Sequence, residues 1–186
     1  NKPSDNVIKV LEKKLNDDKE IQLLALNVLG GMGDKAQRVV PSLLKIIKNN
    51  NKEVGQTAIK TLAKIDSGSQ KVVSFLYKVI KNKQRSEEIR KSSIVSLAKM
   101  KKNSTSKLVK LIKSVDKKMY LPLIKSLDMI EELPKNLVPE LTQILKNNRD
   151  SNRLKEETIK VLCRIARKEK VYKILSGLKW EERFID

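Results

Sequence analysis

The chain has 186 residues, 39% hydrophobic and only 3% aromatic, with few glycines and prolines, which suits a helical domain with a buried core and disfavours a turn-rich β fold. Its 41 lysine and arginine residues against 22 acidic residues give a net charge of +19, which favours acidic partners such as nucleic acid, anionic lipid or an acidic protein surface. Because histidine is absent and Cys163 is the single cysteine, the chain lacks a disulfide framework, a usual zinc ligand set and the common general base, and we expect no metal, no cofactor and no catalytic residue.

Five segments share one apolar spacing and predict five amphipathic helices, called B helices here. In chain order they are 19–33, 52–66, 87–101, 117–131 and 152–166. Equivalent positions recur every 30 to 35 residues, which is the signature of a repeat protein. On a helical wheel the inward columns begin at Ile21, Ala25, Leu26, Leu29, Gly30 and Met32, and the Leu29 column continues as Leu62, Leu97, Leu127 and Leu162.

Shorter apolar segments precede the B helices and predict a second set, the A helices, at 6–16, 38–49, 71–82, 106–114 and 136–147. The turns between A and B helices are rich in Asp, Asn and Ser, whose side-chain oxygens accept hydrogen bonds from the free amides of the next helix. No segment shows the alternation of a half-buried strand. Each unit is therefore an A helix, a short turn and a B helix, and the chain is predicted to be all-α.

The last residues of the chain depart from this repeat. Apolar residues at helical spacing predict one more amphipathic helix, and bulky side chains follow it: Val171, Ile174, Leu175 and Leu178, then Trp180, Phe184 and Ile185. The end of a stacked repeat array leaves an apolar face that must be covered. We expect residues 169–186 to be a C-terminal capping helix and tail of the same domain as a solenoid over residues 1–168, with a partner-binding peptide as the alternative.

Several short motifs in the repeats are specific. Asp17-Asp18 leads into the run Leu23-Leu24-Ala25-Leu26-Asn27-Val28-Leu29-Gly30, followed by Met32-Gly33-Asp34, and Val-Pro pairs occur at Val40-Pro41 and Val138-Pro139. Over residues 5–168 the sequence resembles the HEAT-repeat family. The resemblance implies a right-handed α-α superhelix of about five HEAT-like helix pairs, with the B helices lining the concave surface. The glycines at 30, 31 and 33 follow a helix and precede no Gly-Lys-Ser/Thr, so they indicate a helix end and not a phosphate loop.

The arc of the B helices opposite the core is the candidate binding face, because the resemblance makes it concave. Lysines lie there at i,i+4 spacing, and apolar side chains without a core role lie among them. Exposed apolar residues mixed with lysines are typical of a protein-binding surface. The predicted partner-binding residues are Leu24, Lys60, Lys64, Val95, Lys99, Leu121, Lys125, Met129, Lys160 and Arg164.

The predicted function is a non-enzymatic scaffold or adaptor that binds a protein partner, acidic in character, through the concave B-helix surface. The alternative is nucleic-acid binding through phosphate contacts. Lys45, Lys78 and Lys110 of the A helices weaken this alternative, because charge on both faces is also what a genome rich in A and T codons would produce. Some HEAT-like solenoids resemble DNA glycosylases, but those need aromatic residues and an acidic catalytic group, which this face lacks.

The sequence contains no run of 18 apolar residues, so we expect no membrane span. The numbering starts at Asn1 and not at Met. A removed signal, a tag and upstream domains therefore all stay open, and so do a cytoplasmic and an exported location.

Overall fold

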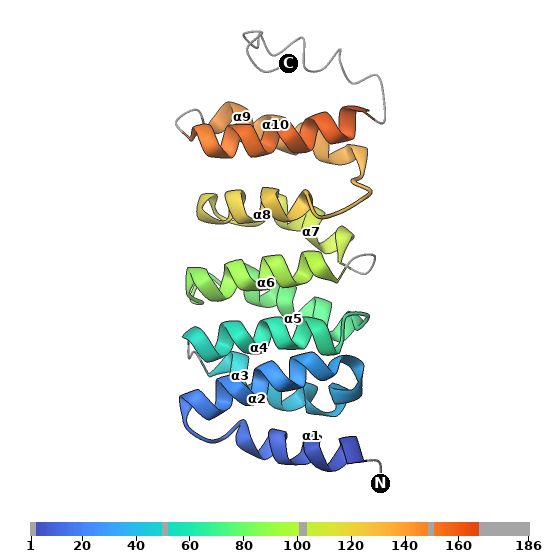
Figure 1. The fold of residues 1–186 in the computed structure, drawn as a ribbon. Helices are drawn as coiled ribbons and strands as arrows, with labels where there is room; N and C mark the ends of the chain where they lie inside the picture. The colour runs from blue at the N-terminus through green and yellow to red at the C-terminus, as the bar shows by residue number, and fades with distance from the viewer. Residues whose placement is uncertain (1–2, 50–51, 101–103, 149–150, 168–186) are drawn as a thin grey trace. The chain divides into compact units, whose positions relative to one another are not determined.

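The computed structural model describes residues 3–49, 52–100, 104–148 and 151–167, and every regular element in these ranges is a helix (Figure 1). The chain divides into two compact units, Asn1–Ile130 and Glu131–Asp186. The predicted C-terminal cap at 169–186 lies outside the described residues. The cap, and the single domain that joins it to residues 1–168, therefore stay predictions.

The first unit alternates A and B helices in the predicted order. Its A helices are α1 (Pro3–Lys14), α3 (Val40–Lys48) preceded by the 3-10 helix η1 (Gly33–Val39), α5 (Gln70–Lys81) and α7 (Thr105–Ile112). Its B helices are α2 (Lys19–Met32), α4 (Lys52–Ile65), α6 (Glu87–Lys99) and α8 (Tyr120–Leu127), the last preceded by η3 (Lys117–Met119). The second unit contains η4 (Lys135–Leu137), the A helix α9 (Val138–Asn147) and the B helix α10 (Asn152–Arg167).

Within the first unit the helices form two layers (Figure 1). In the B layer, α4 packs against both α2 and α6, and α6 packs against α8. The A helices α3, α5 and α7 lie behind this layer, with α3 against α4, α5 against α6 and α7 against α8, and α1 packs against α2. In the second unit α9 packs against α10. The repeated helical pair predicted from the sequence is therefore confirmed.

Side-chain oxygens in the turns start the B helices, as the sequence predicts. The Asp18 carboxylate accepts a hydrogen bond from the Ile21 amide at 3.1 Å. The hydroxyls of Ser86 and Ser151 accept from the amides of Ile89 and Leu154, both at 3.4 Å. Each cap satisfies one of the amides that an α-helix leaves free at its N-terminus, and each contributes about 1 kcal/mol to the stability of its helix.

The glycines near the end of α2 have two different roles. Gly33 has φ +56°, a conformation that side chains disfavour, and it ends the helix as predicted. Gly30 lies inside the helix, where an added Cβ would meet Thr61 Oγ1 at 3.4 Å. Thr61 donates a hydrogen bond of 2.9 Å to the Leu26 carbonyl. Gly30 therefore lies where α2 and α4 pack closely, and a methyl group there would be in van der Waals contact with Thr61.

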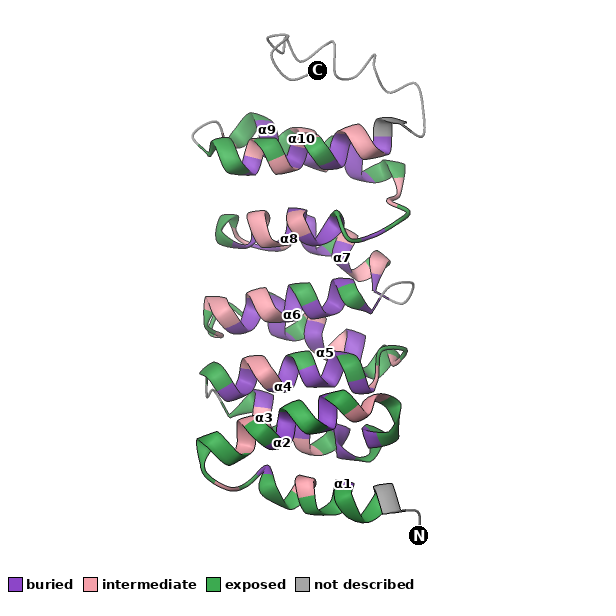
Figure 2. Ribbon diagram, in the orientation of Figure 1, coloured by how far each residue is buried: buried purple, intermediate pink, exposed green. Residues whose placement is uncertain are grey.

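The core follows most of the predicted columns, but Ile21 and Asp128 are exposed and Met32, Ile159 and Cys163 are half-buried. The Leu29 column is fully buried along the chain, and Figure 2 shows the buried stripe on each B helix. Ile21 was predicted to point inward, but 37% of its surface is exposed, whereas its counterpart Ile89 is 2% exposed. The reason is visible at Gly55 of α4, where an added Cβ would lie 2.8 Å from Ile89 Cδ1. This column packs against the preceding B helix, and no B helix precedes α2 among the described residues.

Candidate protein-binding face

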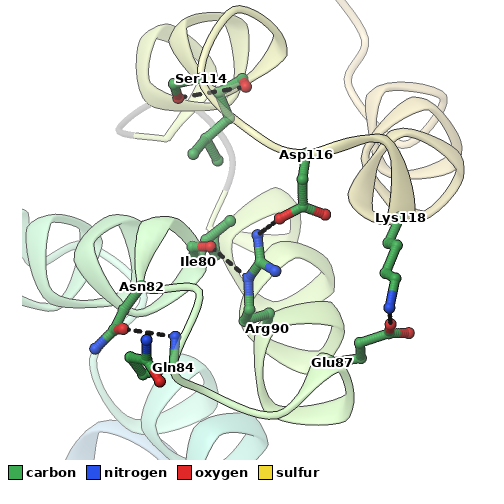
Figure 3. Close-up of polar contacts among 9 residues, drawn as sticks. Ile80, Asn82, Gln84, Glu87, Arg90, Ser114, Asp116 and Lys118 are labelled. Atoms are coloured by element: carbon green, nitrogen blue, oxygen red, sulfur yellow. Dashed lines mark hydrogen bonds and ion pairs between the residues drawn. The ribbon is translucent and has the colours of Figure 1, made fainter.

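The N-terminal ends of the B helices form a row of ion pairs that crosses the repeats. Lys19 of α2 pairs with Glu53 of α4, and Lys52 of α4 pairs with Glu88 of α6 at 2.9 Å. Glu87 of α6 pairs with Lys118 of η3 at 3.1 Å (Figure 3). The charges along this edge therefore compensate one another. All of these side chains are at least one-third exposed, so each pair contributes little to stability.

The lysines of this edge also affect the neighbouring carboxylates. Lys91 and Lys118 donate hydrogen bonds to Glu87 and lower its pKa. Lys52 does the same for Glu88, whose pKa is lowered as well. Both glutamates are therefore ionised at neutral pH, and both lie in the first turn of α6, where a negative charge interacts favourably with the helix dipole.

Farther along the same helices the exposed charge is not compensated. Lys60 and Lys64 of α4 and Lys99 of α6 are exposed, and none of them forms an ion pair within the described part of the chain. Val95 lies four residues before Lys99 on α6 and is 39% exposed, and Met129, which follows α8, is 49% exposed. The B layer therefore has a neutralised edge and a basic region that carries apolar side chains. We call this region the B-helix face: Lys60, Lys64, Val95, Lys99, Leu121, Lys125 and Met129.

The remaining predicted residues are distributed as follows. Leu121 and Lys125 lie on α8 and are half-buried. Leu24 of α2 is 66% exposed, and with Ile21 and Val28 it forms an exposed stripe on the side of α2 that no other B helix covers. Lys160 and Arg164 lie on α10, in the second unit, and Lys160 is 3.8 Å from Glu157.

Met129 requires one correction to its predicted position on a helix. It lies in the turn that follows α8, because α8 ends at Leu127. The amides of Met129 and Ile130 bond to the carbonyls of Ser126 and Leu127, three residues back, instead of continuing the α-helical pattern. The predicted helix 117–131 is therefore a 3-10 turn, a short α-helix and a tight turn.

A buried arginine that sequence reasoning missed holds three elements together (Figure 3). Arg90 of α6 has only 5% of its side chain exposed; its Nε donates to the Ile80 carbonyl at 2.7 Å, and its Nη2 pairs with Asp116 Oδ2 at 2.6 Å. It thus joins the end of α5 to the turn before η3. In the sequence Arg90 stands among the polar residues that begin a B helix, and nothing distinguishes it there from an exposed lysine.

Two opposing effects act on Asp116. Its partial burial disfavours the charged form, but the hydrogen bond and the positive charge of Arg90 outweigh this and lower its pKa. The contact therefore contributes stability above the ordinary pKa of an aspartate, and that stability is lost as the pH falls through the lower pKa of the folded state. The position of η3 and α8 beside α6 depends in part on this ion pair.

Three further properties concern the described residues only. They contain no group of three or more histidine, cysteine, aspartate or glutamate side chains that could hold a metal ion. None of their helices has the length and apolar character that crossing a membrane requires. Cys163 of α10 is a half-buried free thiol.

Stacked helical pairs of this kind define a helical repeat protein. The chain belongs to the HEAT repeats family, which matches residues 5–98. No curated protein sequence matches the chain.

The chain is also similar to solved structures of engineered repeat proteins. An engineered protein from the Northeast Structural Genomics Consortium is 22% identical, with a TM-score of 0.52 over 87% of this chain and 79% of that one. A second engineered protein from the same consortium is 17% identical, with a TM-score of 0.54 over 89% and 82%. A designed armadillo repeat protein in complex with the peptide (KR)4 is 17% identical, with a TM-score of 0.53 over 86% and 80%. At these identities the likeness shows the fold alone.

Proposed function

We propose that the protein is a non-enzymatic scaffold or adaptor that binds a protein partner through the B-helix face. Repeat folds of the HEAT and armadillo kind are generally non-enzymatic scaffolds, since their stacked units present an extended surface. One observation carries the proposal. Lys60, Lys64 and Lys99 are exposed and form no ion pair among the described residues, and the same layer carries exposed apolar side chains, Val95 on α6 and Met129 after α8.

The chemistry of this face indicates the character of the partner. Apolar side chains that become desolvated supply most of the energy of a protein interface, and the surrounding charges set its specificity and its association rate. An acidic rim around an apolar centre would complement the B-helix face. The designed armadillo protein binds a basic peptide; with lysines on its B-helix face, this chain is expected to take a ligand of the opposite charge.

Nucleic acid is the second candidate, supported by the same lysines and by the net charge of +19. Neutralising about four phosphates would give a log–log salt slope of roughly −3 to −4. Against it, the apolar residues of the face would have no use in contacts with phosphates. The A helices also carry exposed lysines, such as Lys78 and Lys110, so diffuse attraction to DNA is expected from both faces.

A pair of matched variants separates these candidates. The first replaces Lys60, Lys64 and Lys99 with Glu, and its control makes the same charge change at the exposed A-helix residues Lys71, Lys78 and Lys110. Binding to a random duplex DNA is measured across a salt series. We expect weak binding that both triple variants reduce equally. Loss in the B-helix variant alone would instead support nucleic acid as the ligand.

The test for a protein partner uses substitutions of exposed apolar residues. Val95→Ser with Met129→Ser is compared with Val7→Ser and Val10→Ser, which alter two exposed apolar residues of α1. Quantitative affinity capture from an extract of the source cells measures which proteins each variant retains. We expect the B-helix double variant to lose a partner that the α1 double variant keeps. Equal retention by both variants would contradict the proposed face.

A further inference from the structure

A second surface of interest lies in the A layer, between α1 and α3. A groove with a volume of about 720 Å³ separates these helices. Lys9, Glu12 and Lys13 line it from α1, and Ser42 and Lys45 line it from α3. This volume is in the range of clefts that bind a drug-sized ligand.

The charges within the groove do not balance. Glu12 is already engaged, because its Oε1 accepts a hydrogen bond of 2.9 Å from Ser42 and its Oε2 lies 3.6 Å from Arg38 Nε. Lys9, Lys13 and Lys45 are exposed and form no ion pair with any residue that the structure describes. The groove therefore presents uncompensated positive charge from both of its walls.

The next junction along the A layer is built differently. There Arg85, which follows α5, donates from Nη1 to the carbonyls of Ile47 and Lys48 at 3.0 Å each. The end of α3 is thus bridged to the following repeat by a guanidinium. At the α1–α3 junction the corresponding region is lined by the side chains of Asn16, Asn49 and Gln22. Carboxamides both donate and accept hydrogen bonds, which suits the main chain of a bound peptide.

We propose that this groove binds an extended acidic peptide segment of a partner protein. Its carboxylates would pair with Lys9, Lys13 and Lys45, and its main chain would bond to the carboxamides at the other end of the groove. The buried side chains of Leu15 and Val54 provide an apolar base for this segment. The site is separate from the B-helix face and does not depend on it.

A nucleic-acid ligand fits this groove less well than a peptide. The Glu12 carboxylate in the α1 wall would repel a continuous phosphate backbone, whereas it can accept a peptide amide through its remaining lone pairs. None of the lining residues is aromatic, so no base could stack there. The two ligand classes are therefore distinguishable by experiment.

The test measures fluorescence anisotropy of a labelled peptide, (Glu-Asp)4, on the full chain. The groove variant carries Lys9→Glu and Lys45→Glu, one from each wall. The control carries Lys78→Glu and Lys110→Glu, which are exposed lysines at the positions equivalent to Lys45 in α5 and α7. Circular dichroism and the melting midpoint verify that both variants stay folded.

We expect the groove variant to weaken peptide binding by about tenfold or more and the control by no more than about twofold to threefold. The variant of the B-helix face, Lys60, Lys64 and Lys99 to Glu, should behave like the control. Replacing Asn49 with Ala in the wild-type chain should also weaken peptide binding. The salt dependence of that binding should not change, because the carboxamide carries no charge. Equal losses in the groove and control variants would overturn the proposal, because they would show only diffuse charge. Absence of peptide binding at low salt, or an effect of the groove variant on duplex DNA alone, would overturn it as well.

Discussion

The first B helix and the interior B helices share a sequence pattern but differ in their surroundings. In α4 and α6 the positions equivalent to Ile21 and Val28 are buried, and those equivalent to Val28 are a threonine and a serine, Thr61 and Ser96. Thr61 uses its hydroxyl to bond α2 at close range. In α2 the same side is apolar and open, with Ile21, Leu24 and Val28 exposed. The local pattern forms the helix, but the neighbouring repeat decides which of its residues are core.

The largest difference in the free energy of unfolding is expected between substitutions at the equivalent isoleucines of α2 and α6. Ile89→Ala removes a buried side chain packed on Gly55 and should lower the free energy of unfolding by about 2–5 kcal/mol through the cavity that it opens. Ile21→Ala makes the same change at a partly exposed position and should cost less than about 1 kcal/mol. Urea unfolding measures both. Equal losses would show that α2 is covered in solution and would contradict the difference between the two helices.

A second comparison concerns the arginines at two junctions. Arg90→Met leaves Asp116 and the Ile80 carbonyl without their partner and should cost about 2–3 kcal/mol. Arg38→Met removes a longer and more exposed contact to Glu12, and should cost at most about 1 kcal/mol. Thermal or urea unfolding of both variants tests this. If Arg38→Met were the more damaging change, the first junction would be the more tightly held of the two.

The pH dependence of folding stability tests the role of the ion pair between Arg90 and Asp116. Because the pKa of Asp116 is lowered in the folded protein, its ion pair stabilises the fold above the usual aspartate pKa of about 3.9 and loses this effect at lower pH. Asp116→Asn should therefore be less stable than the wild type at pH 7, and the gap should close as the pH falls below about 4. A gap that stays constant down to about pH 2 would assign the loss to packing and not to ionisation.

The smallest effects are expected at two helical glycines. Gly31→Ala on α2 adds a methyl group with nothing within 4 Å and should stabilise the helix by about 0.5–1 kcal/mol. The methyl of Gly55→Ala on α4 would lie 2.8 Å from Ile89 Cδ1, so its gain in helix propensity is offset by crowding. The difference between the two melting midpoints is the measurement. A larger gain at Gly55 than at Gly31 would contradict the close packing of α6 on α4.

Much of the fold could be predicted from the sequence because its determinants are local. The Leu29 column, the polar turns and the caps at Asp18 and Ser86 are each set by residues close together in the chain. Ile21 was predicted wrongly because a helical wheel reports only the helix's own periodicity. Its exposure depends on a neighbouring helix, which the wheel does not contain.

The candidate sites could be predicted only in part, and for a related reason. Lys60, Lys64 and Lys99 stand out by their spacing, and that spacing is enough to place them on the outer side of B helices. Whether a lysine has an acidic partner depends on contacts between repeats, as the pairs of Lys52 with Glu88 and of Lys118 with Glu87 illustrate. The groove between α1 and α3 arises from two helices about 30 residues apart in the chain, so no local motif could indicate it.

The most direct test of the proposed function places a photo-crosslinking side chain, benzophenone-alanine, at Val95 in one variant and at Lys78 in another. Both positions are exposed, on α6 and α5 respectively. After irradiation in an extract of the source cells, we expect one discrete protein to be crosslinked from Val95, displaced by excess unlabelled wild-type chain and absent from the Lys78 variant. Crosslinking of nucleic acid in place of protein, or the same products from both positions, would contradict a protein-binding B-helix face.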